Sequence, residues 1–180
     1  MTTSEDRLRD QLARVAEYEE SVRPGPVTRL FRRLGRTKGF ARVYRVVGPK
    51  VDPHVAKIAD GKVLAKVYGF PILLLHTTGA KSGQPRVSPL VYVRDGDDFV
   101  VIGTSFGQPR HPGWTANLRA HPQASVDVGP ERVAVAAEQV DEATWQRIFP
   151  RFVEIYPGYA DYLERRGGLV PRMFLLHPRA

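Results

Sequence analysis

A glycine-bracketed basic turn between two β-rich runs constrains the fold of this chain more than any other feature of its sequence. The apolar run 72–75 precedes the turn, and the run 87–93 follows it. Short apolar and β-branched runs that are bounded by turn residues are typical of buried strands. Gly79 and Gly83 stand between the two runs, where the chain must reverse its direction. The segment therefore predicts a strand, a tight turn and a second strand.

The same turn carries groups that bind anions. Its glycines allow backbone N–H groups to approach a ligand closely, and Thr77, Thr78 and Ser82 supply hydroxyl groups. Lys81 and Arg86 add positive charge, which strengthens hydrogen bonds to phosphate or carboxylate oxygens. These residues predict a phosphate or carboxylate cradle. The alternative is a hairpin with a solvated basic turn, because short motifs of this kind also occur without a ligand.

The rest of the chain predicts an α+β domain. Apolar segments separated by turn residues predict further strands near residues 99–104, 124–128, 133–140 and 173–176. Helical periodicity predicts helices near residues 4–22, 27–47, 112–120, 141–155 and 159–165. Antiparallel strands with few helices between them favour a small β-barrel, here preceded by an N-terminal helical extension.

Positive charge is concentrated in one segment. The formal net charge is +8, and the nine arginines and lysines between residues 21 and 50 have no Asp or Glu among them. A basic amphipathic segment predicts an anionic partner, which is a phospholipid surface, a polyanionic cofactor tail or a nucleic acid. Nucleic acid is the least favoured, because aromatic residues are not interleaved with the basic ones as a single-strand platform requires. We therefore divide the chain into a basic helical extension, residues 1–50, and a barrel domain, residues 51–180.

Composition and patterning exclude several other classes. The chain has no cysteine, which rules out disulfides, cysteine-ligated zinc and thiol catalysis. No apolar run approaches the roughly 20 residues that span a bilayer. The N-terminus lacks the basic and apolar regions of a secretory signal, so we expect a cytoplasmic protein. The five histidines lack the spacing of metal ligands, and no metal site is expected.

Two further segments are candidates for a ligand site. Small residues at 103–107 leave room for a flat ligand, and Trp114 and Asn117 share one face of the helix that follows. Three tyrosines recur at every third position, Tyr156, Tyr159 and Tyr162. Tyrosines suit the wall of a partly exposed pocket, since each joins an apolar ring to a hydroxyl group. The alternative for both segments is ordinary core packing.

These segments, in this order, resemble the deazaflavin-dependent nitroreductase and quinone reductase family. Its members are small split-β-barrel oxidoreductases, related to flavin-mononucleotide-binding barrels, that use coenzyme F-420. The resemblance runs from about residue 70 to the C-terminus, and its strongest part is the segment 77–86. The stretch 88–90, the Thr104–Ser105 loop, the segment 112–118 and the tyrosine triplet also match.

The resemblance implies roles for these residues. Lys81, Ser82 and Arg86 would hold the phosphate and the glutamyl tail of the cofactor, and Ser105 and Tyr159 would be catalytic. Tyr156, Tyr159 and Tyr162 would line the substrate site. The other residues implied to border the cofactor are Val87, Ser88, Pro89, Leu90, Val91, Gly103, Thr104, Ser105, Phe106, Gly113, Trp114, Asn117 and Tyr159.

The resulting prediction is an oxidoreductase that transfers a hydride from reduced coenzyme F-420 to a small electrophile such as a quinone, an enone or a nitro compound. One alternative is the same barrel with flavin mononucleotide (FMN), because the cradle suits either phosphate. Another is a non-enzymatic module that binds an anionic surface, membrane or nucleic acid, through residues 21–50. The resemblance also implies a homodimer and peripheral contact of the basic segment with the inner face of the membrane.

Overall fold

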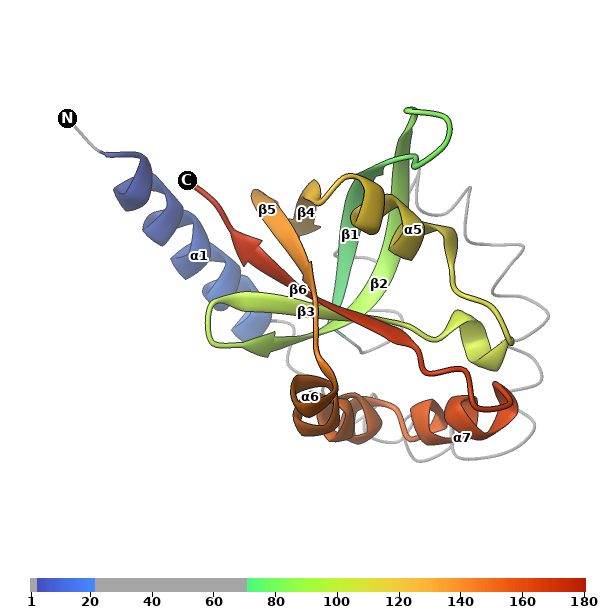
Figure 1. Ribbon diagram of the computed structural model, residues 1–180. Helices are drawn as coiled ribbons and strands as arrows, with labels where there is room; N and C mark the ends of the chain where they lie inside the picture. The colour runs from blue at the N-terminus through green and yellow to red at the C-terminus, as the bar shows by residue number, and fades with distance from the viewer. Residues whose placement is uncertain (1–2, 22–70) are drawn as a thin grey trace.

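Six antiparallel strands form a closed barrel in the computed structural model, which describes residues 3–21 and 71–180 (Figure 1). Around the barrel the order is β1, β2, β3, β6, β5, β4. The strands are β1 (Ile72–Thr78), β2 (Pro85–Asp95), β3 (Asp98–Gly103), β4 (Gln123–Val128), β5 (Glu131–Gln139) and β6 (Arg172–Pro178). The predicted α+β barrel is confirmed, and each of its strands lies within two residues of the expected position.

Helices pack around this barrel. They are α1 (Ser4–Ser21), α5 (Gly113–Ala120), α6 (Glu142–Ile155) and α7 (Gly158–Arg165), with a short 3₁₀ helix, η1 (Ser105–Gly107). Figure 1 shows α6 and α7 together on one side of the barrel, and α5 beside β1 and β2. Sequence periodicity predicted these four α-helices but not η1. The helix predicted near residues 27–47 lies outside the described residues.

The barrel interior is one hydrophobic cluster to which every strand contributes. Its members include Leu75 of β1, Phe99 of β3 and Phe174 of β6, with Trp114 from α5. Helix α1 joins the same cluster through Val15, which is fully buried. Residues 4–21 therefore share a core with the barrel, and the proposed division of the chain at residue 50 stays a prediction.

A second hydrophobic cluster covers the outside of β2, β3 and β6. Val93, Val100 and Met173 alternate along their strands with residues of the interior cluster, so both faces of this part of the sheet are apolar. The partners of the outer face are Ile148 and Phe152 of α6 and the tyrosines of α7. This packing explains why β3 appears in the sequence as a continuous apolar run rather than an alternating one.

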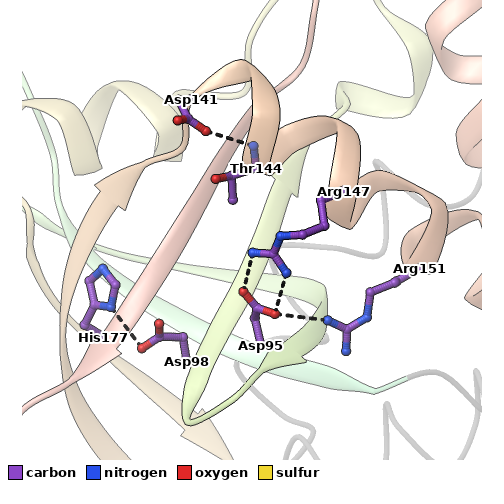
Figure 2. Close-up of polar contacts among 7 residues, drawn as sticks. All are labelled: Asp95, Asp98, Asp141, Thr144, Arg147, Arg151 and His177. Carbon is purple, nitrogen blue, oxygen red and sulfur yellow. Dashed lines mark hydrogen bonds and ion pairs between the residues drawn. The ribbon is translucent and has the colours of Figure 1, made fainter.

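Helix α6 is fixed at its start and along its polar side (Figure 2). Its N-cap residue, Asp141, accepts a hydrogen bond of 2.8 Å from the backbone N–H of Thr144. Arg147 donates two hydrogen bonds, of 2.9 and 2.8 Å, to the carboxylate of Asp95 at the end of β2. Arg151 lies 3.4 Å from the same carboxylate. The contacts fix the orientation of α6 on the barrel.

Replacing Asp95 by asparagine is expected to lower the free energy of unfolding by about 0.5–1 kcal/mol at pH 7, as for other partly exposed ion pairs. The hydrogen bonds from Arg147 hold the pKa of Asp95 below its ordinary value of 3.8. Because the folded-state pKa is depressed, the stabilisation is present above the unfolded-state pKa and is lost as the pH falls through the folded one. Urea unfolding of both proteins at pH 7 and near pH 3 measures this, and an undiminished difference at the lower pH would contradict it.

Candidate functional site

The turn between β1 and β2 has the geometry of a preformed cradle. The N–H of Gly79 donates to the carbonyl of Gln84 at 2.9 Å, and the N–H of Gly83 donates to the carbonyl of Gly79 at 2.8 Å. Gly83 has a φ of 64°, a conformation that favours glycine. A Cβ at Gly79 would lie 2.5 Å from the Oγ of Ser82 and 3.2 Å from the backbone carbonyl oxygen of Gln84, so a side chain here would crowd the turn and displace the Ser82 hydroxyl.

Helix α5 holds the turn in place through Asn117. The side-chain oxygen of Asn117 accepts a hydrogen bond of 2.9 Å from the backbone N–H of Ala80. The side-chain nitrogen donates a hydrogen bond of 3.0 Å to the hydroxyl of Thr77. Asn117 thus uses both ends of its carboxamide to bind the two sides of the turn. The sequence indicated Asn117 as a site residue, but it carried no signal for this contact, which spans 40 residues.

A groove of about 710 Å³ lies between the turn and the start of α5. Its lining consists of Gly79, Ala80, Lys81, Ser82, Arg86, Val87, Ser88, Pro112, Gly113, Trp114, Ala116 and Asn117. Trp114 is only 7% exposed, and its ring centroid lies 5.8 Å from that of Phe174. Trp114 therefore belongs both to the core and to the lining of the groove. A Cβ at Gly113 would meet no atom within 4 Å, which shows that the start of α5 faces open space.

The groove carries positive charge without a matching acid in the described part of the chain. Lys81 and Arg86 are exposed and form no ion pair with any described residue. Within the described part of the chain, the backbone N–H groups of Lys81 and Ser82 donate no hydrogen bond. Two cations and two N–H donors on one turn suit an anionic ligand.

The loop after β3 borders the same region. A Cβ at Gly103 would lie 2.7 Å from a methyl carbon of Thr115 and 3.2 Å from the ring of Pro112, which lines the groove. Ser105 and Phe106 then follow with φ values of 50° and 55°. Two successive non-glycine residues with positive φ store backbone strain, a feature that concentrates at functional sites.

The three tyrosines form one aromatic cluster, in which Tyr159 and Tyr162 lie on α7 and Tyr156 is the C-cap residue of α6. Their ring centroids lie 5.8–6.1 Å apart. Tyr159 and Tyr162 are 8% and 9% exposed, and Tyr162 makes an edge contact with Phe106 at 6.4 Å. The cluster therefore adjoins the Ser105 loop, and it shares the outer hydrophobic core.

The structure divides the predicted site residues into three sets. Eight of them line the groove: Lys81, Ser82, Arg86, Val87, Ser88, Gly113, Trp114 and Asn117. Seven others do not line it: Gly103 ends β3, Thr104, Ser105 and Phe106 follow that strand, and Tyr156, Tyr159 and Tyr162 form the tyrosine cluster. Leu90 and Val91 pack against the interior and outer clusters respectively, and Pro89 pairs with Leu74 of β1.

The described residues contain no group of side chains that could hold a metal ion. In the same ranges, none of the helices has the length and apolar character that a membrane span requires.

Sequence reasoning missed Arg166, which directly follows α7. Its guanidinium donates to three carbonyls of the segment after β3, those of Thr104, Gln108 and Arg110, at 2.6, 3.0 and 3.1 Å. The pair Gly167-Gly168, with φ values of 60° and 87°, is a sequence signal for the end of α7, but nothing in it indicates these contacts.

A closed six-stranded antiparallel barrel with a groove beside its first turn places this protein in the split-β-barrel class. The chain belongs to the F420H(2)-dependent quinone reductase family, whose sequence model matches residues 50–175. The resemblance seen in the sequence is thereby confirmed.

Individual relatives agree with this assignment. The F420H(2)-dependent quinone reductase Rv1261c of Mycobacterium tuberculosis is 46% identical over 82 residues, which are 45% of this chain and 55% of that protein. The chain thus spans about half the length of this relative. The solved structure of an F420-H2 dependent reductase, FDR-A, matches with a TM-score of 0.54 at 33% identity, over 59% of this chain and 94% of that one. A structure described as a domain-swapped dimer matches with a TM-score of 0.55, also at 33% identity, over 59% and 80% of the two chains.

Proposed function

We propose that this protein transfers a hydride from reduced coenzyme F-420 to a quinone. The observation that carries the proposal is the groove beside the β1–β2 turn, in which Lys81 and Arg86 lack an acidic partner among the described residues. An anionic tail fits this turn, and the open face at Gly113 leaves space for a flat ring. Family membership supports the choice of F-420 as the cofactor and of a quinone as the acceptor.

The residues of the chain would divide the work between binding and orientation. Lys81, Ser82 and Arg86 hold the anionic tail by charge and hydrogen bonds. Trp114 supplies an apolar surface for the ring at the base of the groove. Bound in its reduced form, the cofactor supplies a hydride from a ring carbon.

In this proposal the acceptor binds at the loop after β3 and the tyrosine cluster. The hydroxyls of Ser105 and Tyr159 donate hydrogen bonds to the acceptor oxygen, on which negative charge develops as the hydride arrives. The rings of Tyr156 and Tyr162 exclude water and restrict the orientation of the acceptor. Reduction of the quinone to a hydroquinone would also take up one proton, which solvent can supply, so a site that binds and orients the acceptor needs no strong base.

The test is a titration of the purified full chain with F-420 and, separately, with FMN, followed by anaerobic oxidation of reduced F-420 with menadione as the quinone. We expect micromolar or tighter binding of F-420, weaker binding of FMN and menadione-dependent turnover. A preference for FMN would move the protein to the flavin-binding barrels. Binding of neither cofactor would refute the oxidoreductase proposal.

Other acceptors and partners are further parts of this proposal. Enones and nitro compounds present the same electrophilic chemistry to Ser105 and Tyr159.

The charge of residues 21–50 supports contact with an anionic membrane surface from the cytoplasmic side. Sedimentation with anionic and with neutral vesicles would test this contact, and equal binding to both would refute it. A homodimer is also proposed, supported by the relative that is described as a domain-swapped dimer.

A further inference from the structure

Arg166 is the single buried charged residue in the described part of the chain. It follows the last residue of α7, and only 1% of its surface is exposed. Burying a charge is costly unless its hydrogen-bonding groups are satisfied. The position of Arg166 therefore requires an explanation from its partners.

Those partners are backbone carbonyls of two segments. The Nη1 group donates to the carbonyls of Thr104, Gln108 and Arg110, at 2.6, 3.0 and 3.1 Å. The Nε group donates to the carbonyl of Leu169 at 2.8 Å. One side chain thus joins the end of α7 to the whole segment between β3 and α5.

The fifth contact of the guanidinium is to His111, whose Nδ1 lies 3.5 Å from the Nη2 of Arg166. Burial, together with the charges of Arg172 and Arg166, lowers the pKa of His111, so its ring stays neutral and Nδ1 can accept a hydrogen bond. Burial also lowers the pKa of Arg166, but a guanidinium remains protonated in proteins. The positive charge is therefore compensated by carbonyl dipoles, with no described carboxylate in contact with it.

The segment that Arg166 holds contains the strained residues Ser105 and Phe106. A backbone with positive φ at two non-glycine residues persists only when its surroundings fix it. Within the loop, Gly107 donates to the carbonyl of Thr104 at 3.0 Å, and Gln108 donates to that of Ser105 at 3.0 Å. Arg166 adds the contacts from outside the loop, and it shares the carbonyl of Thr104 with Gly107.

The loop also packs against α7 itself. A Cβ at Gly107 would lie 3.3 Å from the Cα of Tyr162, so loop and helix are packed in direct contact. Lysine does not substitute for arginine here, because its three donors share one nitrogen, whereas Arg166 reaches Leu169 and the loop with separate nitrogens. Arg166 therefore connects the loop that contains Ser105 to the end of the helix that carries Tyr159 and Tyr162.

We propose that Arg166 is a positioning residue, which holds the Ser105 loop in its strained conformation and in register with Tyr159 and Tyr162. This inference rests on the proposed function, since Ser105 and Tyr159 are assigned there to the acceptor site. The proposed activity would then require a buried guanidinium group between the Ser105 loop and α7, which no sequence motif indicates.

The experiment compares the wild-type chain with Arg166→Lys, Ser105→Ala and the double variant. We expect Arg166→Lys to lower kcat with menadione by about tenfold to a hundredfold, the usual consequence of a small misplacement. The affinity for F-420, which depends on the cradle, should change by less than about threefold. The double variant should lose less than the product of the two single losses, because both act through Ser105.

Hydrogen exchange supplies a readout that is independent of activity. Amides of residues 103–111 should exchange faster in Arg166→Lys, while those of β1 and β4 stay unchanged. Arg147→Lys is the matched control, since it removes a bidentate guanidinium contact of α6 outside the groove and the loop. The control should leave kcat and exchange in 103–111 unaltered.

The outcomes separate the two proposals. Unchanged kcat and unchanged loop exchange in Arg166→Lys would overturn the positioning role. If the wild-type chain neither binds F-420 nor reduces menadione, the proposed function fails, and loop exchange alone decides whether Arg166 holds the loop. If Arg166→Lys does not fold, the nitrogen-15 spectrum of the wild type decides instead. Slowly exchanging Nη1 protons of Arg166, which donate to the loop carbonyls, support the role, and rapidly exchanging ones overturn it.

Discussion

Replacing both Lys81 and Arg86 by alanine is expected to weaken F-420 binding by about a hundredfold or more, and each single replacement by about tenfold. A hydrogen bond to a charged group contributes roughly 1.5–3 kcal/mol, and exposure to solvent lowers that contribution. Both side chains are exposed and carry no described ion pair, so their removal should leave the free energy of unfolding nearly unchanged. The loss would therefore reflect the cradle and not the fold.

Cofactor fluorescence measures this prediction at two salt concentrations. The wild-type affinity should fall as salt rises, and the double variant should be less sensitive to salt, because fewer charges remain to be screened. Arg119→Ala is the matched control, since it removes one exposed positive charge of α5 that does not line the groove. An equal loss of affinity in this control would show that general charge, rather than the cradle, attracts the cofactor.

Local patterns in the sequence predicted most of this fold. The strand–turn–strand at residues 72–95 was predictable because glycine position, β-branched content and apolar runs act over a few residues. The sequence Asp95-Gly96-Asp97-Asp98 likewise predicts the turn between β2 and β3, in which Gly96 adopts a φ of 62°. Eight predicted cofactor residues line the groove, because they lie in two short segments whose neighbouring strands and helix had been placed correctly.

The remaining features depend on contacts between distant segments. Asn117 binds the turn only because α5 folds back onto β1. Arg166 lies 62 residues from Thr104, and an arginine after a helix normally indicates a solvated C-terminus. The positive φ values of Ser105 and Phe106 carry no local signal, since neither residue favours that conformation.

For Trp114 and the tyrosines, the sequence is compatible both with core packing and with a ligand site. The structure shows that Trp114 belongs to the interior cluster and also lines the groove. Tyr159 is likewise part of the outer core, and its ring makes an edge contact with Phe152 at 5.5 Å. The periodicity of apolar residues indicates that a side chain faces the core, but it does not indicate whether the same side chain also borders a groove. Groove and core share Trp114 because the groove lies on the surface of the barrel.

Phe152→Ala is expected to lower the free energy of unfolding by about 3–5 kcal/mol, the range for truncating a buried phenylalanine. Phe152 is fully buried between α6 and the outer face of the barrel, beside Ile148 and Tyr159. Its removal would leave a cavity that the barrel strands, fixed by their ladder, cannot close. Since small domains have only about 5–15 kcal/mol in total, this one residue supports a large share of the stability.

Urea unfolding of the wild type, Phe152→Ala and Phe152→Leu measures the effect. Phe149→Ala is the control on the same helix, and it should cost less because Phe149 is only half-buried. A loss below about 1 kcal/mol in Phe152→Ala would show that α6 contributes little to the stability of the barrel. Phe152→Leu keeps most of the volume and should cost less than about 1.5 kcal/mol. It nevertheless removes the ring that contacts Tyr159. If kcat with menadione falls markedly while the free energy of unfolding is nearly kept, the loss of activity comes from the orientation of Tyr159 and not from the stability of the fold.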